Sequence, residues 1–181
     1  MIKINQNSLE TLFRSLNELY PTLEINSKKY QGLNIFHALH KENDEVRLHS
    51  RFLSFLLSPT SSHNKGNFFL KSFLEITEIK NFKVDDNIKV IPNEENKSEK
   101  DNIDILIVGK NQAIIIENKI YAGDSNNDSG GQIETYINKV KADGKKLDDI
   151  SVVYLTPNGH EPSKESVGKY FDKDIHLLSY K

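Results

Sequence analysis

The sequence lacks cysteine altogether, and it contains no long hydrophobic run. Without cysteine the chain forms no disulfide and offers no thiolate to a metal, which suits a reducing compartment. No apolar stretch approaches membrane-spanning length, and the first residues, "MIKINQNSLETLF", have no apolar core of a secretory signal. We therefore expect a cytoplasmic protein without a membrane partner.

An excess of charge of one sign is also lacking, since 24 Lys and Arg stand against 26 Asp and Glu. A net charge of -2 gives no overall attraction to a polyanion, so any nucleic-acid binding must come from a local basic patch. A length of 181 residues fits one domain with a core of its own. We expect a single domain over 1–181, with a helical part over about 1–78 and an α/β core over about 79–181.

Hydrophobic spacing predicts several helices followed by a sheet. Apolar residues at helical spacing predict helices over 8–20, 28–41, 43–57, 66–76 and 131–142. Shorter apolar runs predict strands over 82–91, 103–108, 113–118, 151–156 and 174–180. Strand, helix and strand between 113 and 156 form a βαβ unit, so part of the sheet should be parallel. The expected fold class is α/β, with a mixed central sheet flanked by helices and extra helices at the N-terminus.

Charged residues interrupt the most apolar segment, "IDILIVGKNQAIIIENKI". A hairpin whose even-numbered loop is centred between Lys110 and Asn111 pairs Asp104 with Glu117, with Cβ atoms about 4.5–5.5 Å apart on one face. Lys119 lies two residues further along and shares that face. Two carboxylates this close raise each other's pKa unless a cation lies between them, and magnesium prefers such oxygen ligands. The alternative is a set of edge-strand charges that deter aggregation, although "AIIIEN" is too uniformly apolar for an edge.

These segments resemble the PD-(D/E)XK nuclease superfamily, with Asp104, Glu117 and Lys119 matching its Asp, Glu and Lys. "QIETY" is similar to the Gln-x-x-x-Tyr element of RecB-like members through Gln132 and Tyr136. "EVRLHSRFLSFLLSPTSSH", "FFLKSFLE" and "VVYLTPNG" resemble a bacterial branch that is often associated with defence. The resemblance runs from about residue 42 to 159 and implies a restriction-endonuclease-like core. One departure is Asn102, which stands where that branch often has an arginine.

The resemblance implies a metal-dependent phosphodiesterase that acts on DNA and leaves a 5′-phosphate and a 3′-hydroxyl. Asp104, Glu117 and the backbone carbonyl of Asn118 are then expected to hold magnesium, with manganese as a substitute. Lys119 is expected to orient the attacking water and to neutralise charge on the phosphate, and Gln132 to help place that water. RNA as the substrate, a homodimer and a larger defence or repair complex stay open.

Helix geometry selects two further residues independently of the resemblance. At about 100° per residue, Glu45 and His49 fall near the middle of the apolar arc of the helix over 43–57. In many members of the resembled superfamily a helix glutamate reaches the metal site, so the resemblance implies that Glu45 completes the metal shell. His49 is expected to contact a phosphate or a side chain that itself holds the metal. The alternative is a first-turn glutamate that pairs locally with His49. Arg51 lies on the other side of this helix and is expected to face outward, without a role.

Three more residues are candidates for nucleic-acid binding: Tyr136, Lys139 and His63. A tyrosine at the position of Tyr136 is more often a core residue with a hydrogen-bonded hydroxyl, so Gln132 is the better functional candidate on this helix. Lys139 belongs to a basic helix end that could meet a phosphate backbone, with solvation as the ordinary explanation. For His63, substrate contact and simple capping stay open.

Two further alternatives concern the whole chain. The first is a catalytically inactive relative that uses the same fold to bind nucleic acid or protein; the complete set of signature residues argues against it, and the acidic balance argues mildly for it. The second concerns the end of the chain, where "HLLSYK" indicates a strand about to enter more structure. A minimal domain and a C-terminally truncated one both fit this pattern.

Overall fold

The structure is a computed structural model that describes residues 49–92, 99–120, 126–127 and 130–180. The helices predicted over 8–20 and 28–41 lie outside these ranges, as does the first part of the helix predicted over 43–57. A single domain over 1–181 therefore stays a prediction. None of the helices in the described ranges has the length and apolar character needed to cross a bilayer.

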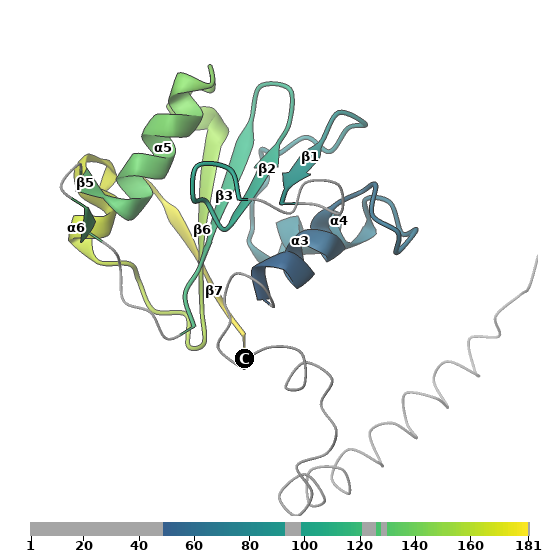
Figure 1. Ribbon diagram of the computed structural model, residues 1–181, viewed down its shortest axis with the longest axis horizontal. Helices are drawn as coiled ribbons and strands as arrows, with labels where there is room; N and C mark the ends of the chain where they lie inside the picture. Colours follow the sequence, from purple (N-terminus) through teal and green to yellow (C-terminus); the bar gives the residue numbers. More distant parts are fainter. Residues whose placement is uncertain (1–48, 93–98, 121–125, 128–129, 181) are drawn as a thin grey trace, which may run out of the picture. The chain divides into compact units, whose positions relative to one another are not determined.

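The centre of the fold is a five-stranded mixed sheet (Figure 1). Its strands lie in the order β1 (Lys89–Ile91), β2 (Ile105–Val108), β3 (Ala113–Asn118), β6 (Ile150–Thr156) and β7 (Ile175–Ser179). The first three pair antiparallel, whereas β3, β6 and β7 pair parallel. The α/β class with a mixed sheet is thus confirmed, and so is the parallel step from β3 to β6.

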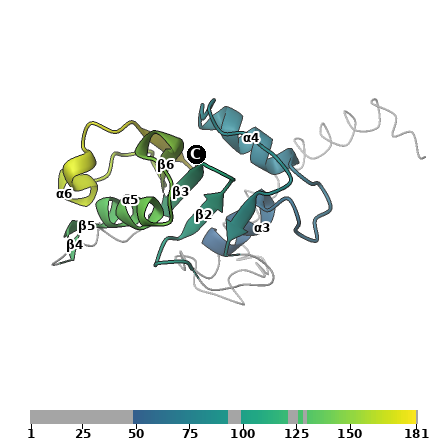
Figure 2. The ribbon, with the colours of Figure 1, turned by 90° about the horizontal axis from the view of Figure 1, so that it is seen from above.

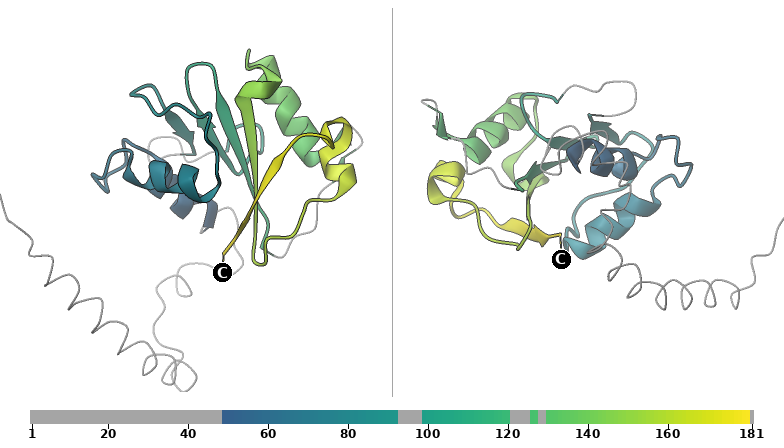
Figure 3. Two further views of the ribbon diagram at one scale, coloured as in Figure 1. Left: turned by 180° about the vertical axis from the view of Figure 1, so that it is seen from behind. Right: turned by 60° about the horizontal axis from the view of Figure 1, so that its bottom comes forward.

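Helices cover both faces of this sheet (Figures 2 and 3). On one face lie α3 (Arg51–Leu57) and α4 (Phe68–Ile76); on the other lie α5 (Gln132–Ala142) and α6 (Lys164–Val167). Side chains that alternate along the strands divide between two apolar clusters: Ile114 and Ile116 pack toward α4, and Ile115 packs toward α5. Because both faces are covered, "AIIIEN" is buried at every position, which explains its uniform apolar character.

Several short elements had no sequence signal, because none is long enough to show a hydrophobic period. They are β4 (Asn126–Asn127), β5 (Gly130–Gly131), α6 and the 3-10 turns Leu147–Asp149 and Gly168–Tyr170. Most of the longer elements match their predictions more closely, although the strand predicted over 82–91 is limited to Lys89–Ile91. The third helix ends at Leu57, before Pro59, as predicted, and α5 begins at Gln132, one residue after the predicted start.

The register of the β2–β3 hairpin places the candidate residues. Ile105 pairs with Ile116, and Val108 pairs with Ala113, so the loop is centred between Lys110 and Asn111 as predicted. The backbone N–H of Gly109 donates to Gln112 O at 2.9 Å and closes this loop. The next pair in this register, at the opposite end of the hairpin, is Asp104 and Glu117.

Candidate active site

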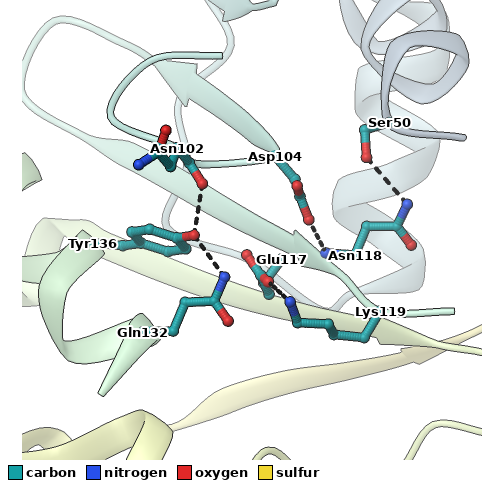
Figure 4. Close-up of polar contacts among 8 residues, drawn as sticks. All are labelled: Ser50, Asn102, Asp104, Glu117, Asn118, Lys119, Gln132 and Tyr136. Atoms are coloured by element: carbon teal, nitrogen blue, oxygen red, sulfur yellow. Dashed lines mark hydrogen bonds and ion pairs between the residues drawn. The ribbon is translucent and has the colours of Figure 1, made fainter. Parts of the chain in front are cut away.

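Asp104 and Glu117 lie at the same end of the hairpin, where β2 begins and β3 ends (Figure 4). Leu106 and Ile115 belong to the apolar cluster under α5, and strand alternation puts Asp104 and Glu117 on that same face. Both acids are buried. Asp104 Oδ2 accepts a hydrogen bond of 2.8 Å from the backbone N–H of Asn118, which ties the start of β2 to the end of β3.

Lys119 forms a buried ion pair with Glu117. Its Nζ lies 2.8 Å from Glu117 Oε1, and the two side chains are 9% and 1% exposed. The backbone N–H of Lys119 donates to Leu155 O at 2.8 Å, so β6 holds the chain just beyond β3. The two acids and the ammonium therefore gather at one end of the sheet.

Helix α5 supplies two polar side chains to the same face. Gln132 Nε2 donates to the Tyr136 hydroxyl at 2.7 Å, and that hydroxyl donates to Asn102 O at 2.6 Å. Burial raises the pKa of the Tyr136 hydroxyl well above its usual range, and the negative charges of Glu117 and Asp104 act in the same direction. The hydroxyl therefore stays protonated, and it lies close enough to both carboxylates to be affected by their charge.

Asn118, between Glu117 and Lys119, turns its side chain to the opposite face. Its Nδ2 donates to Ser50 Oγ at 3.1 Å, and its Oδ1 accepts from the Tyr180 hydroxyl at 2.7 Å. One fully buried amide thus joins the start of α3 to the residue that follows β7. The His49 ring meets the Tyr180 ring edge-on, with centroids 5.8 Å apart, so His49 lies one side chain away from Asn118.

The donor atoms at this end of the sheet suit a hard divalent cation. Asp104, Glu117 and the Asn118 carbonyl offer oxygen ligands of the kind that magnesium prefers. Within the described ranges, no group of three or more His, Asp or Glu side chains is arranged to hold a metal ion. The third expected acid, Glu45, lies outside those ranges, so the full ligand set stays a prediction.

A family model for the PD-(D/E)XK nuclease superfamily matches residues 33–181. The chain belongs to this superfamily. Membership supports a nuclease-type phosphodiesterase with nucleic acid as its substrate class. Among curated proteins and among solved structures, no significant match to the chain was found.

His63, one of the residues predicted from the superfamily pattern, is engaged within its own loop. Its Nε2 lies 3.1 Å from both Leu56 O and Ser58 O, and its Nδ1 accepts from the backbone N–H of Lys65 at 2.9 Å. A proton on Nε2 satisfies all three contacts. The capping alternative therefore accounts for both ring nitrogens, and we leave His63 out of the proposed function.

Lys139 holds a tight turn that precedes β2. Its Nζ donates to Asp101 O at 2.8 Å. Asp101 and Asn102 both have positive φ, and Ile103 N–H donates to Lys100 O at 3.0 Å, as in a type I′ turn. Lys139, the predicted phosphate contact, therefore connects α5 to this turn through its ammonium group.

The sequence analysis missed Glu99, the residue just before that turn. Burial raises the pKa of the Glu99 carboxyl, and the positive charges of Arg51 and Lys119 oppose this rise. Arg51 is exposed, as predicted, but it acts on an acid that also feels Lys119. The sequence around Glu99 is polar and has no periodicity. Nothing in the sequence therefore indicated that the Glu99 side chain lies near the site.

Replacement of Tyr136 by phenylalanine tests the link between α5 and the site. The change removes the acceptor of the Gln132 amide and the donor to Asn102 O, so we expect the free energy of unfolding to fall by about 1–3 kcal/mol. We also expect slower cleavage, because Gln132 loses its anchor. Urea denaturation and a cleavage assay measure the two effects.

A matched control is Tyr170→Phe, which removes another buried hydroxyl that donates to Asn138 Oδ1 at 2.7 Å. This variant should lose similar stability and keep its cleavage rate. Equal cleavage rates in both variants would argue against a role for Tyr136 at the site.

Proposed function

We propose that the chain is a magnesium-dependent deoxyribonuclease, with manganese as a substitute ion. The observation that supports this most directly is that the β2–β3 register ends at Ile105 and Ile116, which brings Asp104 and Glu117 to the next position, with the Lys119 ammonium held against Glu117. The three groups share one face of the sheet in a chain of the PD-(D/E)XK nuclease superfamily.

Each residue has a distinct role in this proposal. Asp104, Glu117 and the Asn118 carbonyl hold the ion, and Glu45 completes the ligand set. When bound, a divalent cation polarises the phosphate and makes water a stronger nucleophile at neutral pH. The Lys119 ammonium orients the attacking water and neutralises charge that develops on the phosphate.

The side chains around the acids support this chemistry. Gln132, held by the Tyr136 hydroxyl at 2.7 Å, helps to place the water. His49 is the remaining candidate for a phosphate contact, since its ring packs on Tyr180 beside Asn118. DNA is the proposed substrate and RNA the alternative; the defence-associated branch and a role in defence or repair stay predictions.

A catalytically inactive module is the competing proposal. The ion pair between Glu117 and Lys119 favours it to a degree, because this pair already compensates one buried acid without a metal. A pure binding module has no need for a carboxylate-dependent metal site. Metal binding therefore separates the two proposals more cleanly than nucleic-acid binding does.

Manganese titration into the wild-type protein and the Asp104→Asn variant tests the proposed activity. We expect calorimetric binding in the wild type, at least about tenfold weaker binding in the variant, and DNA cleavage only when the ion is present. Asp148→Asn, an exposed acid in the 3-10 turn after α5, is the control and should behave as the wild type. Equal metal binding by Asp104→Asn, or cleavage in EDTA, would overturn the proposal.

A further inference from the structure

The first residue of α3, Arg51, lies at the edge of the candidate site. Ser50, directly before it, is buried and accepts a hydrogen bond of 3.1 Å from the Asn118 side chain. Asn118 in turn stands between Glu117 and Lys119 along the chain. The helix therefore begins at the end of β3 that carries the acids, and the side chain of Arg51 is exposed there.

Glu99 connects this arginine to Lys119. Its carboxylate interacts electrostatically with both cations, and it adds to the negative charge felt by the Tyr136 hydroxyl. Its Oε1 atom is buried and has no hydrogen-bond partner in the part of the chain that the structure describes. Two cations and one poorly satisfied acid thus share this edge of the site.

The position of Glu99 follows from the turn that comes after it. That turn is closed by Ile103 N–H on Lys100 O, and α5 holds it through the Tyr136 hydroxyl on Asn102 O. An ion pair between Lys100 and Asp143, near the end of α5, adds a further anchor. Glu99 is therefore kept at the site by the same helix that carries Gln132.

A buried carboxylate oxygen without a hydrogen bond destabilises the protein. A rearrangement that returns Glu99 Oε1 to water is therefore favourable. A phosphodiester offers the same kind of anionic oxygen acceptors, and the guanidinium fork binds them through two parallel hydrogen bonds. Lys119 is buried and paired with Glu117, whereas the side chain of Arg51 is exposed and within reach of an incoming ligand. The net charge of -2 also requires that any attraction for nucleic acid comes from local cations of this kind.

We propose that Arg51 binds a backbone phosphate of the nucleic acid beside Lys119, in exchange for its interaction with Glu99. This inference rests on the proposed nuclease function, because it assumes that nucleic acid reaches the acids of the site. Glu99 interacts with the two cations when no substrate is bound, and the incoming phosphate takes its place at Arg51.

The test is the salt dependence of binding to a short fluorescent DNA duplex in EDTA, where no cleavage occurs. Arg51→Ala should weaken binding about tenfold. It should also reduce the magnitude of the negative slope of log K against log salt by about 1, because one phosphate contact is lost. Arg51→Lys keeps the charge, so the slope should be retained although some affinity is lost. Glu99→Gln removes a competing negative charge and should tighten binding.

The matched control is Lys83→Ala, which also removes one exposed cation. The backbone N–H of Lys83 donates to Gln112 Oε1 at 2.9 Å, so this lysine lies at the end of the hairpin away from the acids. Its slope should equal that of the wild type. An unchanged slope in Arg51→Ala would overturn the inference, and so would equal losses in Arg51→Ala and Lys83→Ala.

The outcomes also separate this inference from the proposed activity. A wild-type protein that binds DNA but never cleaves it, with a reduced slope in Arg51→Ala, refutes the activity and keeps the phosphate contact. Normal cleavage with unchanged binding in Arg51→Ala refutes only the contact. Weaker binding by Glu99→Gln refutes the exchange, and a wild type that binds no DNA refutes both proposals.

Discussion

Replacement of Glu117 by glutamine is expected to lower the rate of the proposed DNA cleavage by about a thousandfold or more. The variant keeps the shape of the side chain and one oxygen, but it removes the negative charge that the proposed ion requires. It also leaves the Lys119 ammonium, 2.8 Å from the original carboxylate, without this partner. Single-turnover cleavage at saturating magnesium measures the chemical step apart from product release.

The glutamine variant needs a control of the same chemical change elsewhere. Glu75 is exposed on α4, and Glu75→Gln should retain the wild-type rate. Manganese calorimetry on Glu117→Gln should show weakened binding together with the loss of rate. A variant at Glu117 that cleaves as fast as the wild type would remove this residue from the proposed mechanism.

Lys119→Met should produce the largest change in stability. The methionine fills a similar volume but leaves Glu117, which is 1% exposed, and the neighbouring Asp104 without the buried ammonium. Removal of one partner of a buried ion pair costs about 3–5 kcal/mol. Urea denaturation in EDTA should therefore show a loss of this size, and cleavage should also be lost.

Magnesium should return more stability to Lys119→Met than to the wild type. The extra uncompensated negative charge binds a cation more tightly, and a ligand that binds only the folded state stabilises it by mass action. Lys89→Met, an exposed lysine on β1, is the control and should show neither the loss nor the added response. If Lys119→Met unfolds like the wild type with and without magnesium, the buried ion pair between Glu117 and Lys119 does not contribute to the free energy of unfolding.

The hairpin could be predicted because local rules determine it. An even-numbered loop centred between Lys110 and Asn111 sets which residues face each other, and this register brings Asp104 opposite Glu117. The parallel pairing of β3 with β6 followed similarly from the helical pattern between them. These arguments use residues that lie close together in the sequence.

Other parts of the site depend on contacts between residues far apart in the chain. The Asn118 side chain meets Ser50, 68 positions earlier, and Tyr180, 62 positions later, and neither partner shows any local signal. Glu99 follows from a turn whose two central residues have positive φ, a geometry that the Asp-Asn pair permits but does not demand. Lys139 looked like a solvent-facing cation, because a bond to a backbone carbonyl leaves no trace in the sequence.

The link between Asn118 and Tyr180 has a practical consequence for handling this protein. Residues that follow the last strand of a sheet often tolerate change, because little depends on them. Here Tyr180, the residue after β7, donates directly to the amide that lies between Glu117 and Lys119. Loss of the Tyr180 hydroxyl, or a deletion that begins at this residue, would thus disturb the end of the sheet that carries the two acids.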